Sequence, residues 1–230
     1  MGWFDLVSNY AIIKFPTQVP WGKHTAAKYR LAHATDKAAK INKEWVLPVV
    51  TIRNPYSWFK SMCNNPYTAR WDHGKRQNCP MLQNDDGGPN PCTVRFADNR
   101  TDKHDSIAHL WNDWYNEYVR DADFPFLVVR MEDLVFYAKE TTTAICECAG
   151  GKIRTDQSFS YVVQSAKADS KGHDISTGIF EAWVKYSKPY QPQAGFTDVD
   201  YALAKQYLDP NLMELFGYRH PPPSGVDVTG

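Results

Sequence analysis

An apolar run in the first half of the chain constrains the fold more than any other feature. Residues 45–52, WVLPVVTI, are almost continuously apolar and rich in β-branched side chains, which is typical of a strand covered on both faces. Asn54 and Pro55 follow as a side-chain cap and a first helical residue, so a helix is predicted from Pro55 to about Asn64. The run therefore predicts a strand joined directly to a helix, with Arg53 at the junction.

A second apolar run, residues 124–136 (FPFLVVRMEDLVF), predicts another buried strand, which carries Arg130, Glu132 and Asp133 toward its end. Two buried strands, each joined to helices, indicate an α/β fold with a parallel sheet. A helix over residues 137–148 should follow the second strand and stop at Gly150 and Gly151. Further helices are predicted over residues 26–43, 106–121, 198–207 and 210–216, and a short strand over residues 9–15.

Residues 67–105 are dense in Pro, Gly, Asn and Asp and predict a long surface excursion. Loops of this length in compact domains are often functional. A chain of 230 residues is long enough for one sizeable core, so we expect a single domain over residues 1–230.

Charge and cysteine content limit the classes of partner. Lys+Arg and Asp+Glu number 26 each, so any anion site must be local and nucleic acid is not an expected partner. No apolar run is long enough to span a membrane. Five cysteines allow at most two disulfides; Cys79 and Cys92 flank a turn-rich loop and could pair, and Cys63 could join either. Together with a possible glycosylation sequon at Asn99, these cysteines favour the secretory lumen.

Arg53 lies where ligands bind in parallel sheets, beyond the carboxyl end of a strand. The first amides of the following helix should point at the same place, and Ser57 and Ser61 lie on one face of that helix. An Arg fork, helix amides and a hydroxyl together suit a phosphate monoester. The alternative is that Arg53 pairs with Glu132 or Asp133 on the neighbouring strand.

Three segments carry a resemblance to the sulfotransferase family. TIRNPYSWFKSM (residues 51–62) resembles the family's 3′-phosphate-binding segment, in which a helix Ser follows eight positions after the Arg; here these residues are Arg53 and Ser61. FLVVRMEDLV resembles the family's Arg-x-Glu-Asp-Leu strand, and LMELFGY resembles its closing helix. The matches occur in family order over residues 45–218.

The resemblance implies a three-layer, mainly parallel sheet flanked by helices, the P-loop NTPase-like sulfotransferase fold. It also implies sulfuryl transfer from 3′-phosphoadenosine 5′-phosphosulfate (PAPS) to a hydroxyl, with a carbohydrate or another small molecule as acceptor and no metal. The 3′-phosphate would bind at Arg53, Ser61 and Ser57, and a later Lys-Gly segment at Lys171 and Gly172 would close over it. The family's Gly/Ser/Thr-rich loop for the 5′-phosphosulfate is not visible, which predicts an N-terminally truncated or degenerate member.

Many sulfotransferases place a His with a nearby Lys before the Arg-Asn-Pro strand, and His24 and Lys23 occupy a comparable position here. A His of near-neutral pKa can take the proton of the acceptor hydroxyl, and Lys23 could stabilise charge on the leaving phosphate. The alternative is that His24 is a surface residue at a turn. The predicted acceptor surface is the mixed aromatic and basic part of the excursion, comprising Tyr67, Arg70, Trp71, His73, Lys75 and Arg76.

Two other functions fit parts of the sequence. A kinase-like nucleotide-binding enzyme would need a Walker loop with a Mg²⁺-binding hydroxyl, which is not visible. A non-catalytic binding module that retains the sheet would explain the missing phosphosulfate loop. Oligomeric state cannot be derived from this sequence.

Overall fold

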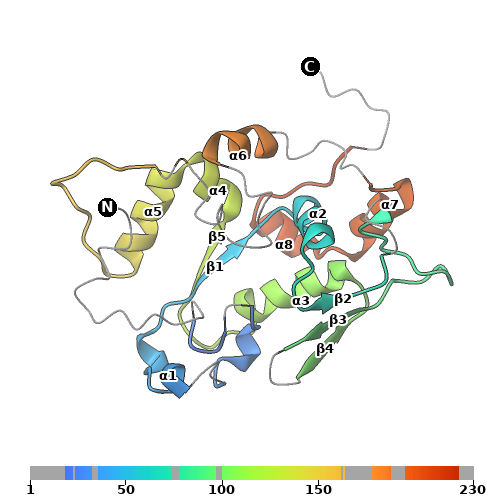
Figure 1. Cartoon of the computed structure of the whole chain (residues 1–230), viewed down its shortest axis with the longest axis horizontal. Coiled ribbons are helices and arrows are strands. Elements are labelled where there is room, and N and C mark those ends of the chain that lie inside the picture. The colour runs from blue at the N-terminus through green and yellow to red at the C-terminus, as the bar shows by residue number, and fades with distance from the viewer. Residues whose placement is uncertain are drawn as a thin grey trace. The chain divides into compact units, whose positions relative to one another are not determined.

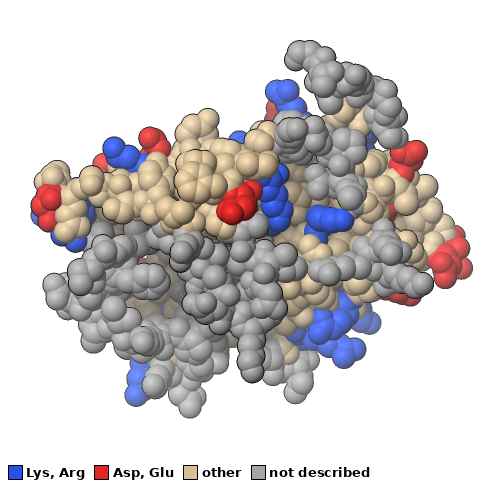
Figure 2. All heavy atoms as spheres, turned by 45° about the horizontal axis from the view of Figure 1, so that its top comes forward, with Lys and Arg blue, Asp and Glu red and all other residues tan. Residues whose placement is uncertain are grey.

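The computed structural model describes residues 19–22, 24–32, 36–73, 78–96, 100–161, 163, 178–187 and 195–222. It shows an α/β fold with a small parallel sheet and helices (Figure 1), as the sequence predicts. The chain divides into two compact units, each described separately below. None of the described helices is both long and apolar enough to cross a membrane. On the face shown in Figure 2, both signs of charge are dispersed in small groups.

The first unit takes its residues from 1–24, 29–52 and 124–188. Strand β1 (Val49–Ile52) pairs in parallel with β5 (Leu127–Arg130), in a register that places Val49 opposite Leu127. The expectation that β1 is covered on both faces is wrong, because burial alternates along it: Val49 is 43% exposed whereas Ile52 is fully buried. The other elements wholly within this unit are α1 (Asp36–Ala39), a 3₁₀ helix at Lys43–Trp45, α4 (Met131–Phe136), α5 (Ala138–Cys148) and α6 (Ile179–Tyr186).

The long helix predicted over residues 26–43 is broken into short pieces. A 3₁₀ turn at Ala27–Tyr29 is followed, after a gap in the described residues, by the single turn α1. The ammonium group of Lys43 donates to the carbonyls of Leu31 (2.6 Å) and Ala32 (2.7 Å). The chain therefore turns back on itself here, since this Ala- and Lys-rich segment has no apolar stripe to hold a long helix against a core.

The second unit takes its residues from 25–28, 53–123 and 189–230. Helices α2 (Pro55–Asn64), α3 (Ile107–Val119), α7 (Asp198–Tyr207) and α8 (Pro210–Leu215) confirm the predicted helices. Helix α3 contacts α2, α7 and α8, and its predicted apolar stripe faces inward. The largest buried side chains of this unit are Tyr56, Phe59, Leu82, Ile107, Trp111 and Leu212.

The predicted excursion over residues 67–105 contains a sheet that the sequence did not reveal. Strands β2 (Ala69–Arg70), β3 (Cys92–Arg95) and β4 (Thr101–His104) pair antiparallel in that order. The strands are only two to four residues long, so their period-two pattern is hidden among turn residues. The sheet belongs to the second unit.

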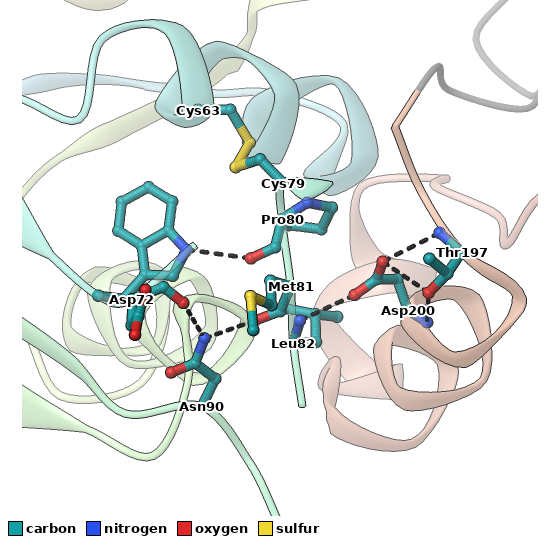
Figure 3. Close-up of a disulfide and its surroundings, with 10 residues drawn as sticks. Cys63, Asp72, Cys79, Pro80, Met81, Leu82, Asn90, Thr197 and Asp200 are labelled. Atoms are coloured by element: carbon teal, nitrogen blue, oxygen red, sulfur yellow. Dashed lines mark hydrogen bonds between the residues drawn. A yellow bond between two sulfur atoms is a disulfide. The ribbon is translucent and has the colours of Figure 1, made fainter. Parts of the chain in front are cut away.

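A disulfide joins Cys63, at the end of α2, to Cys79 in the excursion (Figure 3). The pairing of Cys79 with Cys92 that the loop spacing suggested is wrong, and the alternative with Cys63 is found, at a Cα–Cα distance of 5.9 Å. Cys92 is a buried thiol of β3. Burial raises the pKa of this thiol to about 12, so it carries almost no thiolate at neutral pH to attack the disulfide.

Hydrogen bonds anchor the three residues that follow Cys79 (Figure 3). The indole of Trp71 donates to the carbonyl of Pro80 at 3.0 Å, and the amide of Asn90 donates to the carbonyl of Met81 at 2.8 Å. The buried carboxylate of Asp200 in α7 accepts the amide of Leu82 at 2.8 Å. The excursion is therefore tied to α7 as well as to α2.

Candidate functional site

The candidate site lies in the second unit, at Arg53 and the first turn of α2. The Nε of Arg53 donates to the hydroxyl oxygen of Ser57 at 2.8 Å, and that hydroxyl donates to the carbonyl of Asn54 at 3.0 Å. These bonds hold the guanidinium against the first turn of α2. Helical spacing puts Ser61 one turn farther along the same face as Ser57. The structure thus joins Arg53 directly to Ser57, and Ser61 follows in sequence on that side of the helix.

The first amides of α2 are not available as predicted. The side-chain oxygen of Asn54 accepts the amides of Tyr56 (3.1 Å) and Ser57 (3.4 Å), and Pro55 has no amide hydrogen. The next amide, of Trp58, bonds to the Asn54 carbonyl at 2.9 Å. The expectation of free helix amides at this site is therefore wrong, because Asn54, which caps the helix, accepts hydrogen bonds from them. An anion here would depend on the Arg53 guanidinium and on hydroxyl groups.

The backbone carbonyl of Arg53 accepts a hydrogen bond from a side chain of α3. The indole nitrogen of Trp111 donates to the Arg53 carbonyl at 3.2 Å. Trp111 is fully buried, and its ring packs against Tyr115 and Tyr218 at centroid distances of 5.2 and 6.4 Å. The apolar stripe of α3 predicts that Trp111 is buried, but nothing in the sequence identifies its bond to residue 53.

A cluster of aromatic rings lies around Tyr56 in the first turn of α2. The Tyr56 ring stacks on Tyr201 at 5.9 Å and contacts Phe59 and Phe196. Its hydroxyl lies 2.7 Å from Nδ1 of His220. Burial raises the pKa of Tyr56 and, with a further contribution from the Lys205 ammonium, lowers that of His220. Both side chains are therefore neutral at pH 7, and the hydrogen bond between them places the segment after α8 against α2.

Four further site residues were predicted from the sequence, namely Lys23, His24, Lys171 and Gly172. His24 is an exposed residue at a turn of the first unit. Lys23, Lys171 and Gly172 lie outside the described residues. The roles of these four residues stay predictions.

The second family-like segment differs from its predicted form. Strand β5 ends at Arg130, and MEDLVF forms helix α4, so the predicted strand over residues 124–136 is too long. The Nε of Arg130 lies 3.6 Å from a carboxylate oxygen of Asp133, an ion pair across the start of α4. Glu132 is buried. Two acidic residues in the first turn suit the positive end of a helix, which explains why the chain turns helical there.

The predicted acceptor surface is partly described. Tyr67 is half exposed, and the ring of Trp71 lies 4.6 Å from that of His73. Arg70 donates to the carbonyls of Tyr67 and Ala69 at 2.6 and 2.7 Å. Lys75 and Arg76 lie outside the described residues.

Within the described ranges, no group of three or more His, Cys, Asp and Glu side chains is arranged to hold a metal ion. The chain matches no model of a known protein family, no curated protein and no solved structure. Functional assignment must therefore rest on the residues themselves.

Proposed function

We propose that the chain is a PAPS-dependent sulfotransferase acting on a hydroxyl group, with a carbohydrate as acceptor. The observation that supports it is the hydrogen bond from Arg53 to Ser57 at the end of a parallel strand, with Ser61 one helical turn farther on. These are the positions at which the chain resembles the family's 3′-phosphate-binding segment. The proposal includes the P-loop NTPase-like fold, with β1 and β5 as neighbouring inner strands.

In this proposal the 3′-phosphate of the nucleotide binds at Arg53. A planar guanidinium matches phosphate geometry and stays charged at all physiological pH values. Ser61 adds a hydroxyl donor on the same helix face, and the Ser57 hydroxyl, whose proton goes to the Asn54 carbonyl, orients the Arg53 guanidinium. Because Asn54 takes the first amides of α2, Arg53 carries a larger share of the anion's stabilisation than in a site with open helix amides.

The reaction forms a bond between the acceptor oxygen and sulfur and breaks the bond from sulfur to the bridging phosphate oxygen. His24 takes the proton of the acceptor hydroxyl, and Lys23 stabilises the charge that develops on the leaving phosphate. Lys171 and Gly172 close over the 3′-phosphate. The disulfide between Cys63 and Cys79 supports a place in the secretory lumen, such as the Golgi.

Thermal unfolding with 3′,5′-adenosine bisphosphate and with ATP tests the nucleotide site. At a hundredfold excess over its Kd, the bisphosphate should stabilise the protein by about 2.7 kcal/mol, which raises Tm by roughly 5–11 °C for a chain of this size. ATP, which lacks a 3′-phosphate, should give a much smaller shift. Arg53→Ala should abolish the response, and Arg53→Lys should not restore it, because Lys cannot form the fork.

Arg154→Ala is the matched control, since Arg154 is an exposed arginine whose ion pair with Asp156 is local. It should leave the nucleotide response intact. A wild-type protein whose Tm is unchanged by either nucleotide would favour the non-catalytic binding module. If Arg53→Ala keeps the full Tm shift with the bisphosphate, the nucleotide binds at a site that does not include Arg53.

A further inference from the structure

The antiparallel sheet of β2, β3 and β4 has one buried and one open face. Side chains alternate between the faces along each strand. Ala69, Cys92 and Val94 are buried, whereas their strand neighbours point the other way. The open face carries three cations and two hydroxyls, namely Arg70, Thr93, Arg95, Thr101 and Lys103, and is called the cationic face below.

The pairing register sets the spacing of these charges. Thr93 of β3 is opposite both Arg70 of β2 and Lys103 of β4, and Arg95 is opposite Thr101. Neighbouring strands are about 4.8 Å apart, so the Arg70 and Lys103 backbones are separated by about 10 Å with a hydroxyl between them. Arg95 lies about 7 Å farther along β3.

Among the residues that the structure describes, no carboxylate forms an ion pair with the cationic face. Arg70, Arg95 and Lys103 are exposed, and none of them forms an ion pair with another part of the chain that the structure describes. The nearest acidic residue of the sheet, Asp102, alternates to the opposite side, where it pairs with Lys28 at 2.9 Å. Although the chain has equal numbers of acidic and basic residues, three cations that form no ion pair within the described ranges thus lie together on one small sheet.

An exposed tyrosine borders the cationic face. Tyr67 is 50% exposed and has a φ of 52°, a left-handed conformation that is rare for a residue with a large side chain. Arg70 fixes this turn by donating to the Tyr67 carbonyl at 2.6 Å. Strained, solvent-displayed residues of this kind concentrate at binding sites. An aromatic ring beside cations offers a flat surface for a sugar and charges for its anionic groups.

We infer that the cationic face binds an acidic polysaccharide, a glycan chain that carries sulfate or carboxylate groups. Charge complementarity requires a polyanion. The buried disulfide between Cys63 and Cys79 adjoins this region and indicates an oxidising compartment, where acidic glycans rather than nucleic acids are the available polyanions. The inference does not depend on the proposed nucleotide site, since it uses neither Arg53 nor the serines of α2.

Binding of a heparin oligosaccharide to the whole chain, measured by titration calorimetry at low and at physiological ionic strength, tests the inference. The test variant replaces all three cations of the face, as Arg70→Gln, Arg95→Gln and Lys103→Gln. The control variant removes the same charge from exposed lysines elsewhere, as Lys40→Gln, Lys139→Gln and Lys152→Gln. The test variant should raise the Kd for heparin by about tenfold or more and weaken its salt dependence, whereas the control variant should bind like wild type.

Because Arg70 also supports a turn, the double variant Arg95→Gln with Lys103→Gln provides a second measurement that leaves that turn intact. It should weaken heparin binding by at least about threefold, since two of three contacts are lost. Three outcomes would overturn the inference: wild type does not bind heparin, the control triple variant loses as much affinity as the test variant, or single-stranded RNA or phosphatidylserine vesicles bind more tightly than heparin through the same residues.

Discussion

At the scale of single residues, Asn54 decides how α2 begins. Its side-chain oxygen accepts two backbone amides, and the residue is almost completely buried, so water cannot replace that oxygen. Asn54→Ala should lower the free energy of unfolding by about 1–2 kcal/mol, which corresponds to a fall in Tm of roughly 2–8 °C. Chemical denaturation measures the loss.

Asn54→Ser serves as the matched variant, because a serine oxygen can cap the same amides. It should recover most of the stability lost in Asn54→Ala. If the alanine variant is as stable as wild type, the cap contributes nothing and the account of the capped amides is wrong.

Single residues also show which interactions a sequence can predict and which it cannot. Asn54 and Pro55 were predicted correctly as cap and first helical residue, because capping acts between residues that are close in sequence. The partners of Trp111 and Tyr56, namely the Arg53 carbonyl and His220, lie 58 and 164 positions away. Local patterns carry no information about such pairs, so the support of Arg53 from α3 could not be predicted.

At the scale of elements, the contact between α2 and His220 should depend on pH. Burial, followed by the Lys205 ammonium, lowers the pKa of His220 in the folded state, whereas the unfolded chain has the ordinary value of about 6.5. The unfolded state therefore binds the proton more readily, and the stability contributed by neutral His220 is present above about pH 6.5 and lost as the pH falls below it.

Unfolding by urea at pH 7.5 and pH 5.5 measures this effect as a difference between proteins. Wild type should lose more stability on acidification than His220→Gln, which keeps a polar side chain but does not titrate in this range. Equal losses in the two proteins would show that His220 has no part in the pH dependence.

Elements differ in how well their sequence predicts them. Helices α2, α3, α7 and α8 were predicted because their caps and apolar spacing agree. The helix expected over residues 26–43 relied on propensity alone, which is weak without a packed face. The sheet of β2 to β4 was missed because each strand is too short to display alternation among Pro and Gly.

At the scale of the whole molecule, the disulfide between Cys63 and Cys79 is the strongest covalent constraint that the structure describes. It closes a segment with a sequence separation of 16 residues, which in the chain-entropy account stabilises the fold by about 3 kcal/mol. Reduction, or the variant Cys79→Ser, should lower Tm by roughly 6–12 °C. Differential scanning calorimetry with and without reductant tests this.

Cys148→Ser is the control, because Cys148 is an exposed free cysteine at the end of α5. It should match wild type in Tm and retain the sensitivity to reductant. A reductant effect that persists in Cys79→Ser would mean that another cysteine pair stabilises the chain.

The carboxylate of Asp200 should couple the local opening of two segments, the loop around Leu82 and the start of α7. One of its oxygens takes the amide of Leu82, while the other takes the amide and hydroxyl of Thr197 at the start of α7. Exchange of the Leu82 amide proton for deuterium therefore requires the hydrogen bond to this carboxylate to break. Because Asp200 lies 118 positions later, in the first turn of α7, opening of the loop around Leu82 should be coupled to fraying of that helix. Mass-spectrometric exchange should find both segments becoming labelled on the same timescale.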